Sequence, residues 1–198
     1  MSNHPMHESL ITYIKNYSTT PLSENEIEAI KDVFVRKKIR KHQYLLQEGE
    51  VCKHAAFIVK GAMRQYSVDD RGVEHIIRLF IENWWAADRE SYVMLTPSKY
   101  NIDAWEECEL LLITKADFLS QMSHIPAIQE MTLKMDENFA IAAQKRVASI
   151  SLSAEERYSE LTKNHPEFLQ RFPQHIIASY LGVTKETLSR IRRHSVKK

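Results

Sequence analysis

The residues best placed to do chemistry in this chain lie near its C-terminus, between Gln174 and Arg193. The spacing of the apolar residues predicts two short helices, each with one inward face: Ile177, Leu181, Val183, Leu188 and Ile191. Gly182 falls between the helices, at a turn that often requires a positive φ angle, and small Ala178 lies where the helices must approach closely. The pattern predicts a helix-turn-helix.

The second of these helices has a polar and basic outer face. Its members are Lys185, Glu186, Ser189, Arg190 and Arg193. Such a helix can enter the major groove of DNA with its N-terminal residues against base edges. An ordinary pair of packed helices would explain the apolar spacing, but not the placement of Ala178 and Gly182 or the basic outer face.

Charge is unevenly distributed along the 198 residues, although the formal net charge is only +1. From residue 185 onward a single acid, Glu186, stands against six basic residues: Lys185, Arg190, Arg192, Arg193, Lys197 and Lys198. A basic end on a near-neutral chain suits a DNA-binding module attached to a domain with another role. For Lys197 and Lys198 a solvated tail is the simpler interpretation.

Composition excludes several other classes of protein. The two cysteines, Cys52 and Cys108, cannot by themselves build a zinc or iron–sulfur site, so we expect no metal and no cofactor. The segment from Met1 to His7 lacks the features of a secretion signal, and no apolar run approaches the ~20 residues of a membrane span. We therefore expect a cytoplasmic protein with no membrane partner. No catalytic set of residues is evident, and an enzyme is not expected.

The chain before the helix-turn-helix divides into two helical segments and a β-rich region. Residues 7–19 and a segment starting at Ser23, with a capping box to Glu26, predict helices. Short strands are then predicted at residues 44–46, 56–59, 63–68, 75–80 and 109–113, with a hairpin turn at residues 69–72. Strands this short and this regularly interrupted favour a small barrel or roll.

A helical pattern returns at residues 115–122 and again after Pro126. In the second stretch, steps of three and four residues mark a coiled-coil-like seam that includes Ile128, Thr132, Met135, Phe139 and Ala142. The seam predicts a dimerisation helix, with a core helix lying on its own domain as the alternative. Ser153 and Glu156 then form a second capping box, and Pro166 and Pro173 are expected to interrupt a loop.

The order of β-roll, long helix and helix-turn-helix resembles the Crp/Fnr superfamily of bacterial transcription regulators. The stretches Gln47 to Glu50 and Lys60 to Gly61 resemble turns of that family, and residues 183–190 resemble its recognition-helix signature. The resemblance runs from about Pro21 to the end of the chain. It implies that Lys185, Glu186 and Arg190 read base edges, chemistry that suits guanine and cytosine.

The same resemblance assigns contacts with the DNA backbone. It implies that Thr184 caps the recognition helix, while Thr187, Ser189, Arg192 and Arg193 are candidates for phosphate contacts. An alternative for Glu186 is an ion pair with Arg190 one helical turn away. The few residues after the recognition helix predict a reduced wing.

The effector cassette of the family is eroded. Relatives that bind cyclic nucleotides carry Gly-Glu-Leu followed by Arg-Ser or Arg-Thr, where this chain aligns Ala87, Asp88 and Arg89, then Ser98 and Lys99. Asp88 can replace the glutamate with a shorter reach, but nothing in register replaces the arginine that grips the cyclic phosphate. We expect an effector other than cyclic AMP, or none, near Trp85, Asp88, Arg89, Ser98 and Lys99.

Aromatic residues crowd the cassette: Trp84, Trp85, Tyr92, Tyr100 and Trp105. They predict either a core rebuilt with aromatic side chains or a flat apolar pocket for an unknown small effector.

The sequence thus predicts an α+β protein in three parts. Residues 1–122 form a cyclic-nucleotide-binding-like β-roll of double-stranded β-helix (jelly-roll-like) type, residues 123–150 the dimerisation helix, and residues 151–198 a small all-α, winged-helix-like helix-turn-helix domain. The expected function is that of a homodimeric transcription regulator on a near-palindromic DNA operator, with RNA polymerase as a candidate partner. The alternative is a ligand-binding or protein-interaction module whose helix-turn-helix has lost DNA affinity.

Overall fold

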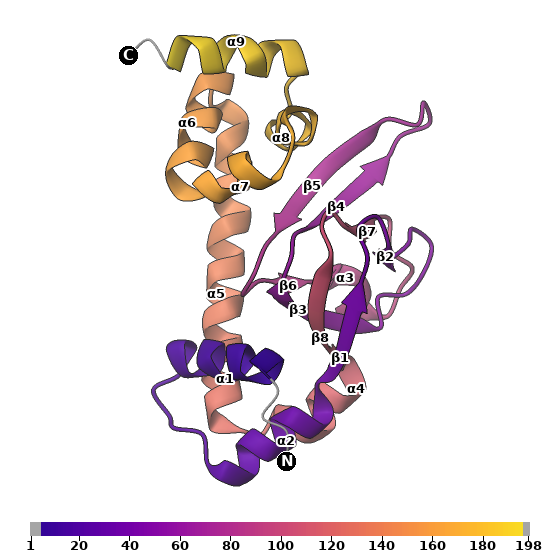
Figure 1. The fold of residues 1–198 in the computed structure, drawn as a ribbon, viewed down its shortest axis with the longest axis vertical. Helices are drawn as coiled ribbons and strands as arrows, with labels where there is room; N and C mark the ends of the chain where they lie inside the picture. Colours follow the sequence, from indigo (N-terminus) through magenta and orange to yellow (C-terminus); the bar gives the residue numbers. More distant parts are fainter. Residues whose placement is uncertain (1–4, 196–198) are drawn as a thin grey trace.

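A two-sheet β-roll lies between helices from both ends of the chain (Figure 1) in the computed structural model, which describes residues 5–195. Two helices precede the roll, α1 (Pro5–Tyr17) and α2 (Glu24–Val33). The predicted capping box starts α2: the Ser23 hydroxyl accepts the amide of Glu26, whose carboxylate accepts the amide of Ser23. Leu10 and Ile14 of α1 are fully buried against the roll.

Each sheet of the roll has four antiparallel strands. The first has the order β1 (Val35–Ile39), β8 (Cys108–Thr114), β3 (His54–Lys60) and β6 (Trp85–Ala86). The second has the order β2 (Tyr44–Leu46), β7 (Asn101–Ala104), β4 (Met63–Val68) and β5 (Glu74–Phe80). Strand β5 therefore lies at an edge of the second sheet, where one side of its backbone has no partner strand.

The five strand segments expected from sequence are all present, and the hairpin at residues 69–72 joins β4 to β5. Strands β1, β6 and β7 were not predicted. Four of the five residues of β1 are exposed, and three of them are basic, so this strand lacks the apolar alternation that marks a half-buried strand. Strand β6 has only two residues, which are too few to form a pattern.

Gly61 permits the tight connection between β3 and β4. Its φ angle is +104°, and a Cβ at this position would lie 2.6 Å from both Cys108 Sγ and the Glu107 carbonyl oxygen. Any larger residue would therefore clash with the start of β8 as well as adopt a strained backbone.

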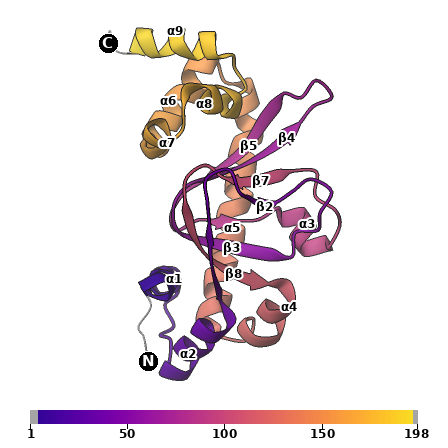
Figure 2. The same cartoon turned by 45° about the vertical axis from the view of Figure 1, so that its right-hand side comes forward.

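A long helix connects the roll with the C-terminal helices (Figure 2). It is α5 (Pro126–Ala148), preceded by the short helix α4 (Lys115–Asp117) and a π-helical turn at Phe118–Met122. A 3-10 turn at Ser149–Ser151 follows it. The predicted dimerisation helix therefore exists as a helix, while its role in dimerisation stays a prediction.

Four helices follow within the described residues: α6 (Ala154–Asn164), α7 (Pro166–Arg171), α8 (Gln174–Leu181) and α9 (Lys185–Ser195). The capping box of Ser153 and Glu156 starts α6, as predicted. The expected loop around Pro166 was wrong, because Pro166 occupies the first turn of α7. Proline suits that position, where its missing amide would have no helical partner.

Buried side chains form three clusters, and the third joins the two ends of the molecule. It combines Ala62, Tyr66, Ile76 and Leu79 of the roll with Phe168, Phe172, Ile177 and Leu181 of the C-terminal helices, among others. The fold class predicted from sequence, an α+β roll with a long helix and a helix-turn-helix, is confirmed. Within residues 5–195 no helix is long and apolar enough to cross a membrane.

Candidate nucleic-acid interface and effector region

Helices α8 and α9 pack as a helix-turn-helix around a buried apolar seam. Gly182 ends α8 in the left-handed conformation with φ +68°, and the amides of Gly182 and Val183 bond to the carbonyls of Ser179 and Ala178 at 3.0 and 2.9 Å. Of the five residues predicted to face inward, Val183 is half-buried and the others are buried: Ile177, Leu181, Leu188 and Ile191. The turn therefore fixes the angle between the helices.

The predicted DNA-contacting residues share the outer side of α9. Lys185, Glu186, Arg190 and Arg193 are exposed, and Thr187 and Ser189 are half-buried. Thr184 caps the helix as expected, since its hydroxyl oxygen accepts the amide of Thr187 at 3.2 Å. Lys197 and Lys198 lie outside the described residues.

Glu186 and Arg190 are not engaged with each other. In the described part of the chain, neither side chain has a partner of opposite charge within 4.0 Å, so the alternative of an intrahelical ion pair is not seen. Charged groups on an exposed helix without internal partners remain able to bond to an external one.

Helix α8 covers the free edge of strand β5, a contact that sequence reasoning missed. The Ser179 hydroxyl donates to the Glu74 carbonyl oxygen at 3.1 Å and accepts the Ile76 amide at 3.0 Å. Sequence offered no signal for this contact, because a serine in a helix usually faces solvent. The contact attaches the helix-turn-helix directly to the roll.

A second contact between the same two regions is ionic. Arg171 of α7 bonds to the carboxylates of Glu82 and Glu106, with its Nε 3.1 Å from Glu106 Oε1 and its Nη2 3.1 Å from Glu82 Oε1. Burial opposes ionisation of Glu82, but hydrogen bonds from Arg171 and from backbone amides outweigh burial and hold the pKa of Glu82 below its usual 4.5. This ion pair and the apolar cluster fix the helix-turn-helix against the roll.

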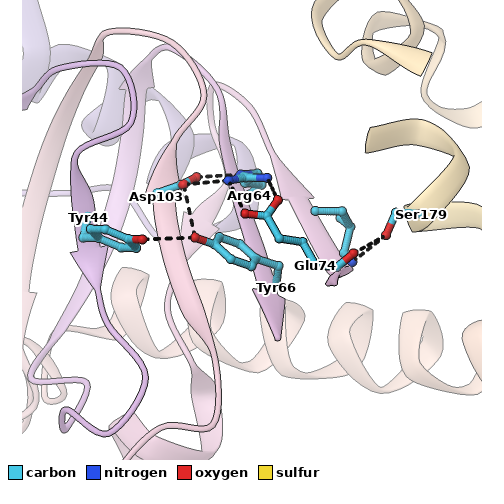
Figure 3. Close-up of polar contacts among 7 residues, drawn as sticks. Tyr44, Arg64, Tyr66, Glu74, Asp103 and Ser179 are labelled. Carbon is cyan, nitrogen blue, oxygen red and sulfur yellow. Dashed lines mark hydrogen bonds and ion pairs between the residues drawn. The ribbon is translucent and has the colours of Figure 1, made fainter. Parts of the chain in front are cut away.

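The edge strand is itself held by an ionic network in which Arg64 and Asp103 are buried and Glu74 of β5 is exposed. Figure 3 shows Asp103 of β7 facing Arg64 of β4, with two bonds of 2.9 and 3.0 Å, and Arg64 reaching on to Glu74. The Tyr66 hydroxyl lies 3.5 Å from an Asp103 carboxylate oxygen and 3.4 Å from the Tyr44 hydroxyl, and its one proton can be donated to either. Burial alone would lower the pKa of Arg64, but the two carboxylates raise it above its usual range.

The eroded cassette brings only two of its five predicted residues together. Asp88 and Ser98 are buried, and the Ser98 hydroxyl donates to Asp88 at 2.7 Å. Arg89, the first residue of α3 (Arg89–Met94), instead pairs with Asp136 of α5 at 2.7 Å. Lys99 is exposed, and Trp85 packs against Phe34 and Phe57. The five residues therefore do not converge on one ligand site.

The aromatic residues around the cassette are half-buried and mostly pack against the cores. Trp85 packs against the first cluster, Tyr92 against the second and Trp105 against the third. Burial raises the pKa of Tyr92 to about 12. This packing matches the prediction of a core rebuilt with aromatic side chains rather than a flat open pocket.

Arg78 is a further cation near this region that sequence reasoning missed. It lies on β5, half-buried, with its guanidinium 4.3 Å from the centre of the Phe139 ring, which Arg89 also faces at 4.5 Å. Burial, with the nearby charge of Arg89, lowers the pKa of Arg78. Among residues 5–195 no carboxylate lies within 4.0 Å of it. The signal in the sequence was an arginine interrupting the apolar second part of β5, residues 76–80.

The seam predicted on α5 faces inward for much of its length. Ile128 is buried in the first cluster, Met135 packs against that cluster, and Phe139 lies under Arg78 and Arg89. Thr132 is half-buried and Ala142 is exposed. The large apolar residues exposed along α5 are instead Leu133, Ile141 and Val147, at 63%, 51% and 68%. Ile128 and Met135 therefore pack on the chain's own core, as in the alternative of a core helix, while the role of the seam in dimerisation stays a prediction.

Comparison with known proteins matches this architecture. Residues 36–124 match the cyclic nucleotide-binding domain family. An anaerobic regulatory protein of Haemophilus influenzae is 26% identical over 184 residues, which cover 86% of this chain and 70% of the relative. A fumarate and nitrate reduction regulatory protein of Yersinia pestis is 24% identical over 181 residues, covering 86% and 72%.

Solved structures share the fold. The structure of FixK2 from Bradyrhizobium japonicum superimposes with a TM-score of 0.70 at 17% sequence identity, and the match covers 82% of this chain and 84% of FixK2. The two curated relatives are named as regulatory proteins, and neither these two nor FixK2 is named as an enzyme.

Proposed function

We propose that the chain, which is similar to transcription regulators of the Crp/Fnr superfamily, binds a specific DNA operator through the outer face of α9. The observation that carries this proposal is the exposed face of Lys185, Glu186 and Arg190 on a helix whose opposite face is buried. Arginine and lysine can bond to guanine, and glutamate can accept a bond from cytosine. Thr187, Ser189 and Arg193 then contact the DNA backbone, together with the capped helix terminus at Thr184.

The active form in this proposal is a homodimer joined along α5. Its outward stripe of Leu133, Ile141 and Val147 supplies apolar area for a second helix, with Ala142 beside it. Two recognition helices would then meet half-sites of a near-palindrome one DNA turn apart, about 34 Å. Val147→Glu is expected to shift the protein toward monomer in sedimentation, while Val93→Glu, at another exposed valine, on α3, leaves the dimer intact.

We divide the chain accordingly into an effector-type roll over residues 1–122, a dimerisation helix over 123–150 and a DNA-binding unit over 151–198. RNA polymerase is the proposed partner in transcription, and the cytoplasm the proposed location. The cassette position that would grip a cyclic phosphate does not hold an arginine, and the nearby Arg89 pairs with Asp136 instead. Cyclic AMP is therefore not the proposed effector. Titration calorimetry with cyclic AMP is expected to give no binding heat.

Selection from a library of random DNA duplexes tests DNA recognition directly. Sequencing of the bound pool should yield a near-palindrome, and Arg190→Ala should weaken binding to it by about 1–3 kcal/mol. Arg36→Ala, an exposed arginine on β1, is the matched control and should bind like the unaltered protein. A pool without enrichment, in protein shown to be dimeric, would favour the second candidate, an interaction module whose helix-turn-helix no longer reads DNA.

A further inference from the structure

A polar groove lies between helix α1 and the turn that joins β5 to β6, beside the start of the cassette region and not on the recognition helix. Its volume is about 570 Å³. One wall is a face of α1, and the other is the turn at Asn83 and Trp84. The lining residues are Glu8, Ser9, Thr12, Tyr13, Asn16, Tyr17, Asn83 and Trp84. We call it the α1–Trp84 groove. Its α1 wall lies outside the residues that match the cyclic nucleotide-binding domain.

Aromatic rings border this groove from both walls. Tyr13 and Tyr17 stack on each other one helical turn apart, with ring centres 4.5 Å apart and planes at 25°. Trp84 belongs to the opposite wall and is half-buried. Such rings offer flat apolar faces with polar edges, which suit a ligand that is itself apolar on one face and polar around its rim.

The polar groups of the groove are those that bond to hydroxyl groups. Asn16 and Asn83 each carry a donor and an acceptor, Ser9 and Thr12 carry hydroxyls, and Glu8 carries a carboxylate that accepts two bonds. None of the eight lining residues is lysine, arginine or histidine. An anionic ligand would have no countercharge here and would face Glu8, so the groove disfavours phosphates and carboxylates.

We propose that the α1–Trp84 groove binds a neutral carbohydrate of one or two sugar rings. The C–H face of a sugar ring packs on Tyr and Trp rings, while its hydroxyls bond to Asn16, Asn83, Thr12 and Glu8. The volume lies within the range of small-molecule sites, about 300–1,000 Å³. This proposal does not depend on DNA binding, since it concerns another surface of the molecule.

Trp84 also connects the groove to the C-terminal helices. Its ring meets the rings of His165 and Phe168 edge-on, with centres 5.4 and 5.7 Å apart. Phe168 lies in α7, and both α1 and α7 lie on the same side of the roll in Figures 1 and 2. A sugar that contacts Trp84 therefore acts on a side chain shared with the unit that carries α9, which gives it a route to bias the position of that unit.

The test is saturation-transfer NMR on the full chain with glucose, galactose, mannose, N-acetylglucosamine and maltose in turn, at millimolar concentration. At least one sugar should show transfer, and Asn16→Arg, which fills the groove from an exposed position, should weaken its binding about tenfold or more. Asn25→Arg introduces the same side chain on an exposed position of α2 and should leave binding unchanged. Adenosine, a neutral nucleoside, serves as the comparison ligand from another chemical class.

Absence of transfer from all five sugars would overturn the proposal, as would transfer that Asn16→Arg leaves unaltered. Binding of adenosine alone, sensitive to Asn16→Arg, would assign the groove to another ligand class. Hydrogen exchange of α7 measures the connection through Trp84: protection there should change with the bound sugar in the unaltered protein and in Asn25→Arg, but not in Asn16→Arg. If hydrogen exchange of α7 did not change when a sugar binds, the connection through Trp84 would be disproved, but the sugar site would not be.

Discussion

The polar side chains of the roll and those of α9 differ in how their hydrogen-bonding groups are used. In the roll Arg64 is bonded to Asp103, and Asp88 to Ser98, with all four side chains buried. On α9 Lys185, Glu186 and Arg190 are exposed, and in the described chain none has an ion-pair partner. Groups that satisfy one another stabilise a fold, whereas groups that satisfy nothing within the chain are free to recognise a partner.

This difference sets the expected effect of substitutions in the two regions. A cyclic nucleotide would have to compete with Ser98 for Asp88, and the position aligned with the phosphate-binding arginine of relatives holds Ser98. Within residues 5–195, Lys185, Glu186 and Arg190 of α9 have no ion-pair partner. Breaking bonds in the roll should therefore reduce stability, and substitutions on α9 should reduce binding alone.

The largest expected effect is the loss of Asp103. Asp103→Ala leaves the Arg64 guanidinium buried with only Glu74 as counterion, and removing one partner of a buried pair costs about 3–5 kcal/mol of unfolding free energy. Urea unfolding of Asp103→Ala measures it, with exposed Asp70→Ala as the control. A loss below about 1 kcal/mol would mean that the network contributes no more than a surface pair.

Ser98→Ala tests the cassette with a smaller expected effect. The substitution removes the donor to buried Asp88 and the acceptor for the Tyr100 amide, which should cost about 1–3 kcal/mol of unfolding free energy. Thermal unfolding measures this loss, and exposed Ser120→Ala should leave the midpoint unchanged. An unchanged midpoint for Ser98→Ala would show that Asp88 is satisfied by other means.

On α9, Arg193→Ala should alter DNA affinity and leave stability unchanged. If Arg193 contacts a phosphate, the slope of log affinity against log salt should fall by about 1, equally for operator and random duplexes. Fluorescence anisotropy over a salt series measures the slope, with exposed Lys53→Ala on the roll as control. If Arg193→Ala lowered the affinity for the operator but not for random duplexes, Arg193 would instead contact a base.

The smallest expected effect concerns the ion pair between Arg171 and Glu82. Because the pKa of Glu82 is lowered in the folded protein, the stabilisation from this pair is complete above about pH 4.5 and disappears as the pH falls through the lowered pKa. The stability difference between the unaltered protein and Arg171→Gln should therefore shrink below pH 4.5 in urea unfolding over a pH series. Arg36→Gln should show no such convergence, and a difference independent of pH would exclude Glu82 as its source.

Much of the fold could be predicted because its signals are local. The capping boxes at Ser23 and Ser153, the hairpin between β4 and β5, and the turn at Gly182 each depend on residues within a few positions of one another. Strand β1 and helix α7 were missed where the local signal pointed elsewhere: a basic, exposed strand in one case and a proline in the other.

The two faces of α5 mark the limit of sequence reasoning about the site. Apolar residues occur on both sides of this helix, so spacing identified one seam and could not say which side the roll would cover. In the structure, Ile128 and Phe139 pack on the side of the roll, whereas Leu133 and Val147 are exposed. Periodicity reports that a face is apolar, but not what covers it.

The sequence alone determined the helix-turn-helix, its outer face and the loss of the cassette arginine, since each depends on residue types at short spacing. Only the tertiary structure decided that Ser179 covers the edge of β5, that Arg171 joins Glu82, and that Trp84 borders a groove with α1. Ser179 and Ile76 are 103 positions apart. Contacts at such separations depend on how whole elements pack, and no local pattern encodes which surfaces will meet.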